Sequence, residues 1–296
     1  MKTSSKTHSI NSLSIKALIP LLIISLLLIS GSAQAHTENE VFIETADMEI
    51  PGIYNVPADH NDEIPAVLML HGFASDKDEV GGFYKLQAER LADMGVASLR
   101  IDFPGSGDSE VDFAENTVDL QNTQALKAYD WLVEQKEVDQ DKVGALGFSL
   151  GGVIATNLAV NRPVKALGLW ATSASTTKAF SWHIMEFKEE AFQEGSVDAD
   201  LGWTEVTLSK EFFQSLYYNN PGYDIRDYQN PLLVVAGELD NHIPSDAREF
   251  ANLAGSFDIT VQIIADAGHT FDILEDEPKT DQVLDITTDW FADRLK

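Results

Sequence analysis

Residues 147–151 read Gly-Phe-Ser-Leu-Gly, and no other segment constrains the fold of this chain as strongly. They follow the apolar residues 143–146 and precede a helical pattern over residues 152–160, which predicts a strand, a tight turn and a helix in succession. Small residues two positions before and after Ser149 let strand and helix approach closely. Such a turn strains the serine backbone and lifts its hydroxyl clear of the sheet, where a base can reach it. An ordinary glycine-rich turn is the alternative interpretation.

Short β-rich runs alternate with helical patterns along the chain, which predicts a mostly parallel sheet flanked by helices. We expect one α/β domain over residues 36–296 with eight strands, the first two forming an antiparallel edge. The expected strands cover residues 41–45, 48–56, 66–70, 96–101, 143–146, 165–170, 232–236 and 260–264. The chief expected helices cover residues 83–94, 118–133 and 281–295.

Nearly sixty residues without a predicted strand separate the sixth expected strand from the seventh, and they hold eleven of the chain's 27 aromatic residues. Helical stretches at residues 179–192 and 209–218 predict a small helical cap of residues 173–228, inserted after the sixth strand. Sheets of this kind bind ligands at the carboxyl edge of their strands. We therefore expect the cap to cover a substrate through Trp182, Trp203 and Phe213. The alternative is a packing insertion whose aromatic side chains only bury one another.

Residues 1–35 have the pattern of a secretory signal peptide: a basic start, apolar residues 17–29 and a small-x-small site ending at Ala35. Cleavage after Ala35 would leave residues 36–296 without membrane insertion. An uncleaved anchor is the alternative, although a spanning helix needs about 20 apolar residues. The chain has no cysteine, which excludes disulfides and a lipid-modified cysteine. We expect a bacterial protein of the periplasm or the external medium.

The formal net charge of the chain is −28. Nucleic acid is excluded as an expected partner because a phosphate backbone needs a basic surface, and an anionic membrane surface is disfavoured for the same reason. Residues 105–107 read Gly-Ser-Gly but lack the third glycine of a dinucleotide-binding loop. With no phosphate-binding loop, no HExxH and no histidine cluster, the sequence predicts neither a cofactor nor a metal.

A serine hydroxyl becomes a good nucleophile only when a base takes its proton. Of the seven histidines, three follow directly on expected strands: His71, His242 and His269. His269 is the favoured base because it follows the last strand in a loop freed by Gly268, on the same sheet edge as Ser149. His242 is the rival base, and His71 is expected to be structural.

Asp240 is the favoured acid partner of His269, because it lies in the loop after the strand at residues 232–236 and can orient the imidazole. Glu238 in the same loop is the second choice. A tetrahedral intermediate also needs donors for its oxyanion. The backbone N–H of Leu150, at a helix N-terminus, is one expected donor. The N–H of Phe73, in the loop after residues 66–70, is the other.

These motifs resemble those of the α/β-hydrolase superfamily, and they are most similar to exported serine esterases of the cinnamoyl and feruloyl type and to serine-aminopeptidase-like relatives. The resemblance covers nearly all of residues 36–296. It is carried by residues 71–73, 100–109, 147–151, 237–240 and 268–269. It implies an α/β-hydrolase fold, a triad of Ser149, Asp240 and His269, and oxyanion donors at Phe73 and Leu150. Phe148 departs from the histidine common at that position, so substrate preference does not transfer.

The expected activity is hydrolysis of carboxylic esters through an acyl-enzyme, with a small-molecule ester as the partner. The alternatives are a serine peptidase or aminopeptidase of the same fold, an acyltransferase, and a non-catalytic binding protein on the same scaffold. A peptidase would need carboxylates in the cap to hold a free amino terminus, and Glu186, Glu189, Glu190 and Glu194 are the candidates. The sequence leaves the oligomeric state open.

Overall fold

A computed structural model describes residues 36–58, 60, 62–180, 184–276 and 278–296. The expected signal peptide and Trp182 lie outside the described residues, so both stay predictions. No helix in the described ranges has the length and apolar character needed to cross a bilayer.

Eight strands form one sheet in the order β1-β2-β4-β3-β5-β6-β9-β10. The strands from β4 to β10 run parallel, whereas β2 pairs antiparallel with both β1 and β4. This confirms the predicted mostly parallel, eight-stranded sheet with an antiparallel edge. The strands are β1 His36–Glu44, β2 Glu49–Pro57, β3 Ile64–Leu70, β4 Ala97–Ile101, β5 Val138–Phe148, β6 Leu167–Trp170, β9 Leu232–Gly237 and β10 Ile259–Ile264.

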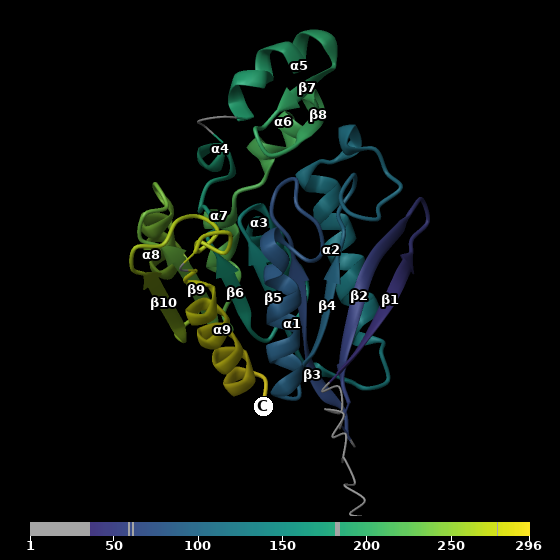
Figure 1. Cartoon of the computed structure of the whole chain (residues 1–296), viewed down its shortest axis with the longest axis vertical. Helices are drawn as coiled ribbons and strands as arrows, with labels where there is room; N and C mark the ends of the chain where they lie inside the picture. Colours follow the sequence, from purple (N-terminus) through teal and green to yellow (C-terminus); the bar gives the residue numbers. More distant parts are fainter. Residues whose placement is uncertain (1–35, 59, 61, 181–183, 277) are drawn as a thin grey trace, which may run out of the picture. The chain divides into compact units, whose positions relative to one another are not determined.

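Helices cover both faces of the sheet, with α1 and α9 in contact on one face (Figure 1) and α2 against α3 on the other. The inner strands β4, β6 and β9 are buried throughout, and β3 is buried except at the half-buried Pro65, as continuous apolar runs require. Trp170 joins β6 to α9 by donating its indole N–H to Thr287 Oγ1 at 2.9 Å. The principal helices are α1 Phe83–Asp93, α2 Val118–Val133, α3 Leu150–Asn161, α8 Ile243–Leu253 and α9 Thr280–Arg294.

The segment between β6 and β9, here called the cap, lies together at one end of the sheet (Figure 1). The prediction that it contains no strand is wrong, because β7 Ser196–Asp200 pairs antiparallel with β8 Glu205–Ser209. Side chains of β7 alternate between buried and exposed, which is the pattern of a half-buried strand. The helices of the cap are α4 Thr176–Ala179, α5 Lys188–Glu194, α6 Lys210–Tyr218 and α7 Pro221–Asp224.

Candidate active site

Ser149 occupies the turn between β5 and α3 with φ 52° and ψ −116°, a conformation that L-residues rarely adopt. Two glycines make the turn possible. A Cβ on Gly147 would lie 2.3 Å from the carbonyl oxygen of Gly151, and one on Gly151 would lie 1.9 Å from that of Leu70. The N–H of Ser149 donates to the carbonyl of Trp170 at 2.8 Å, which ties the turn to β6. The predicted strand–turn–helix is therefore present.

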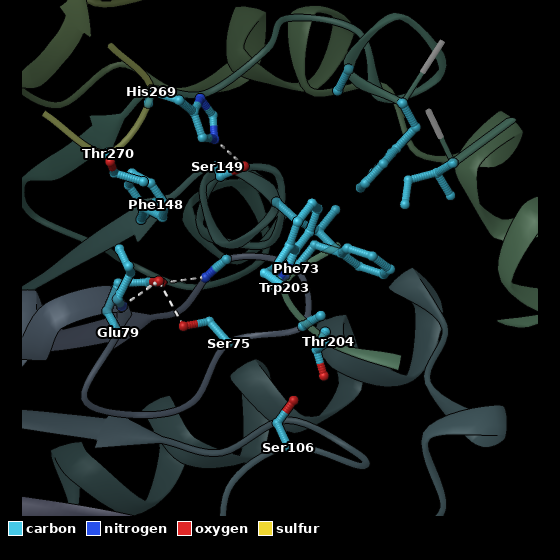
Figure 2. A pocket seen from close by; sticks show the side chains of 18 of the residues that line it. Phe73, Ser75, Glu79, Ser106, Phe148, Ser149, Trp203, Thr204, His269 and Thr270 are labelled. Carbon is cyan, nitrogen blue, oxygen red and sulfur yellow. Dashed lines mark hydrogen bonds between the residues drawn. The ribbon is translucent and has the colours of Figure 1, made fainter. Parts of the chain in front are cut away.

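His269 and Asp240 lie beside this turn. His269 Nε2 is 3.1 Å from Ser149 Oγ (Figure 2), and His269 Nδ1 is 2.7 Å from Asp240 Oδ2. Since an ionised carboxylate only accepts hydrogen bonds, Nδ1 carries the proton and Nε2 faces the serine hydroxyl as an acceptor. Asp240 is 6% exposed. The two loops that follow β9 and β10 thus bring the predicted acid and base to one hydroxyl.

The other two histidines engage different partners. His71 is buried, its Nε2 accepts from the N–H of Phe103 at 3.1 Å, and its Nδ1 is 2.7 Å from the carbonyl of Gly72. Both ring nitrogens are therefore occupied by backbone groups, as a structural role requires. His242 Nε2 is 3.2 Å from Ser173 Oγ, and among the described residues it makes no hydrogen bond to Ser149. Ser173 in turn donates to the buried Asp246 at 2.6 Å.

Phe73 and Leu150, the expected oxyanion donors, both border the cavity beside Ser149. Leu150 is the first residue of α3, where a backbone N–H has no partner within the helix. Within the described part of the chain, neither backbone N–H donates to another backbone group. The ring of Phe73 packs against cap residues Phe180 and Phe212, with centroids 5.2 and 5.3 Å apart. Phe73 therefore joins the cap to the loop beside Ser149.

A cavity of about 960 Å³ lies above Ser149, lined by residues of the strand-end loops and of the cap. Its apolar wall includes Phe73, Phe113, Phe180 and Trp203. Of the two predicted cap contacts among the described residues, Trp203 borders this cavity. Phe213 is fully buried, its ring contacts that of Phe212, and it is absent from the described residues that line the cavity.

Two charged residues of the loop after β3 were not predicted as site residues, and of these Glu79 borders the cavity. Glu79 is buried at its edge, and the N–H of Gly72 donates to its carboxylate at 2.6 Å. Lys77, in the same loop, binds the fully buried Asp102 and also Asp108, each at 2.7 Å. Burial opposes the charge on Lys77, but hydrogen bonds and attraction from both aspartates outweigh it and raise the pKa of the ammonium. No sequence pattern identifies Glu79 as a site residue, because its contact with Gly72 depends on the path of the loop between them.

Comparisons with known proteins agree with this architecture. Residues 67–281 match the model of the alpha/beta hydrolase family. An uncharacterized protein of Mycobacterium tuberculosis is 30% identical over 158 residues, which are 52% of this chain and 52% of that protein. Acylamino-acid-releasing enzyme 2 of Oryza sativa subsp. japonica is 23% identical over 184 residues, 61% of this chain and 24% of the enzyme. The chain thus matches about half, or less, of the length of these curated relatives.

Solved structures show the same fold. Est1E from Butyrivibrio proteoclasticus with ferulic acid bound superposes with a TM-score of 0.70 at 19% identity, covering 86% of this chain and 98% of that one. Dienelactone hydrolase from Anabaena variabilis gives a TM-score of 0.62 at 19% identity, covering 88% and 100%. With a family model that matches most of its length and a sheet ordered as described, this chain belongs to the alpha/beta hydrolase family.

Proposed function

We propose that the protein is a serine hydrolase that cleaves carboxylic esters. The observation that carries this proposal is the continuous hydrogen-bonded row from Asp240 through His269 to Ser149, with distances of 2.7 and 3.1 Å, at the wall of a large cavity. This order of acid, base and hydroxyl activates a serine for attack on a carbonyl carbon. A binding protein on the same scaffold would have no need of a base beside this hydroxyl.

In the proposed mechanism, Ser149 Oγ bonds to the ester carbonyl carbon while His269 Nε2 takes the hydroxyl proton. The carbonyl oxygen becomes an oxyanion that accepts from the N–H groups of Phe73 and Leu150. Collapse breaks the bond to the leaving oxygen, and His269 gives that oxygen its proton, so the alcohol departs. Water then attacks the acyl-enzyme with His269 again as base, which releases the carboxylic acid and restores Ser149.

The cavity supports an apolar or aromatic acyl group. Because His269 protonates the leaving alcohol, the alcohol must lie beside His269, and the acyl group must extend the other way. Phe73 and Trp203 lie on that other side of Ser149 (Figure 2). The ferulic acid in Est1E is an aromatic acid of this kind. We extend that likeness to this chain only as part of the proposal.

The peptidase alternative draws support from the similarity to the rice acylamino-acid-releasing enzyme. It also needs carboxylates of the cap at the cavity to bind a free amino terminus. Glu186, Glu189, Glu190 and Glu194 are absent from the described residues that line the cavity. A 4-nitrophenyl ester and the matching 4-nitroanilide, assayed side by side, separate the two activities. We expect turnover of the ester and little of the anilide.

The Ser149→Ala variant is the control for both substrates and for labelling by a fluorophosphonate. We expect it to lose ester turnover and labelling while its thermal midpoint stays close to that of the unaltered protein. Ester turnover that survives in this variant would exclude Ser149 as the nucleophile. Faster cleavage of the anilide than of the ester would favour a peptidase.

A further inference from the structure

The loop between β3 and α1 folds around one buried carboxylate. Glu79 is 5% exposed, and its two oxygens accept from Gly72 N–H at 2.6 Å, Ser75 Oγ at 2.7 Å and its neighbour Val80 N–H at 2.9 Å (Figure 2). No ion pair to Glu79 is found within the described part of the chain, so these donors compensate the burial of its charge. The proposed mechanism does not use this carboxylate as a base, which leaves its position to be explained.

The backbone of this loop is strained. Glu79 itself has φ 61° and ψ 165°, a region occupied almost only by glycine, and Ala74 has φ 54°. A residue in such a conformation persists only where its surroundings hold it in place. Glu79 supplies that hold, because its carboxylate binds Gly72 at the start of the loop and Val80 at its end.

These contacts also restrain the N–H of Phe73, because it belongs to the peptide unit that joins Gly72 to Phe73. The carbonyl of Gly72 and the N–H of Phe73 share a planar peptide bond, so fixing the carbonyl also fixes the direction of the N–H. His71 Nδ1 donates to that carbonyl at 2.7 Å, since its Nε2 is already an acceptor for Phe103 N–H. Glu79 restrains the other side of the same residue through the N–H of Gly72.

We propose that Glu79 is a positioning residue that keeps the N–H of Phe73 aimed at the oxyanion of the tetrahedral intermediate. This inference rests on the proposed hydrolase function. Glu79 acts through the backbone of Gly72 and does not touch the reacting atoms. Its loss should therefore weaken binding of the transition state and leave binding of the substrate nearly unchanged.

Two near-isosteric variants test the proposal. Glu79→Met keeps the length of the side chain but cannot accept from Gly72, whereas Glu79→Gln keeps one acceptor oxygen. Removing an oxyanion donor outright typically lowers kcat by about 100- to 1,000-fold. In Glu79→Met the N–H of Phe73 remains but points in a less favourable direction, so we expect kcat to fall by about 30-fold while KM stays within about threefold. In Glu79→Gln we expect kcat to fall by less than about fivefold. Affinity for a trifluoromethyl ketone, which forms a tetrahedral adduct, should fall in parallel with kcat.

Asp130→Ala is the control for lost stability, because Asp130 binds Arg162 through both oxygens, far along the chain from this loop. It should lower the thermal midpoint and leave kcat unchanged. Ser75→Ala removes one hydrogen-bond donor to Glu79 and keeps the carboxylate, so we expect it to lower kcat by about threefold. If Glu79→Met does not fold, the kcat of Ser75→Ala tests the positioning role instead. A Glu79→Met enzyme with a lower thermal midpoint but full kcat and ketone affinity would overturn the positioning role. Absence of ester turnover and of fluorophosphonate labelling in the unaltered protein would instead refute the proposed function.

Discussion

Ser149 can be activated only if the nitrogen of His269 that faces it carries no proton, and Asp240 determines which nitrogen that is. With an ionised Asp240 the proton resides on Nδ1, 2.7 Å from Oδ2. In Asp240→Asn the amide can donate to Nδ1, which places the proton on Nε2 and blocks proton transfer from Ser149. We expect kcat for a nitrophenyl ester to fall by about 10⁴-fold while KM changes little.

Glu238→Gln provides the matched control for that prediction, because Glu238 lies two residues earlier in the same loop. Its carboxylate accepts from the N–H of Asp266 at 3.1 Å at the protein surface. We expect its kcat to stay within about twofold of the unaltered protein, since exposed polar contacts contribute little. If kcat fell further in Glu238→Gln than in Asp240→Asn, the acid partner of His269 would be Glu238 and not Asp240.

Residues that follow strand ends could be placed from the sequence, because parallel strands bring their carboxyl ends to one edge. Ser149, Asp240 and His269 come together for that reason. Glu79 could not be placed this way, since its contact with Gly72 depends on the strained path of a loop. Phe213, which the sequence predicts as a substrate contact, is absent from the described residues that line the cavity, whereas its neighbour Phe212 contacts Phe73. Adjacent helical residues point about 100° apart, and the sequence does not say which of the two faces Phe73.

At the scale of elements, apolar content decided which strands were predictable. The buried strands β3, β4 and β9 were found near their observed limits. The edge strand β1 begins at His36, earlier than expected, because its polar residues pair with β2 while facing solvent. The pair β7 and β8 was missed because each strand has only five residues and lies between the predicted helices at residues 179–192 and 209–218. Local pattern therefore identified the sheet better than the cap.

A titratable contact links two helices. Asp130 in α2 binds Arg162, which follows α3, at 2.6 and 2.8 Å, and these hydrogen bonds lower the pKa of the Asp130 carboxyl below its ordinary value of 3.8. A lowered pKa stabilises the folded state above pH 3.8, and this contribution is lost as the pH falls through the folded-state pKa. Both partners are partly exposed, so the contribution is about 1 kcal/mol or less.

The pH dependence of this contact can be measured by urea unfolding of the unaltered protein and of Asp130→Asn. At pH 7 we expect the variant to unfold with a free energy lower by about 0.5–1 kcal/mol. As the pH falls through the folded-state pKa, which lies below 3.8, the two free energies should converge, because the carboxyl is then protonated in both states. A difference that stays constant down to pH 2.5 would mean that Asp130 acts by packing and not by charge.

The whole molecule carries 48 acidic residues against 20 lysines and arginines, and the cavity follows the same imbalance. Among the described residues that line it, four are carboxylates and none is a lysine or arginine. The four are Asp76, Glu79, Glu205 and Asp240. Two like charges about 8 Å apart repel by roughly 2 kcal/mol at an effective dielectric constant near 20. An acyl group that ends in a carboxylate should therefore be rejected.

Hydrolysis of two 4-nitrophenyl esters of equal length, one with a methyl and one with a carboxylate at the far end of the acyl chain, measures this rejection. We expect kcat/KM to be at least about tenfold lower for the carboxylate, and the ratio to shrink in 0.5 M NaCl because salt screens the repulsion. Glu205→Gln should also reduce the ratio, since Glu205 lines the cavity on β8. Glu211→Gln, an exposed neighbour on α6, should leave it unchanged. Equal rates for the two esters would show that the charge of the cavity wall does not select the substrate.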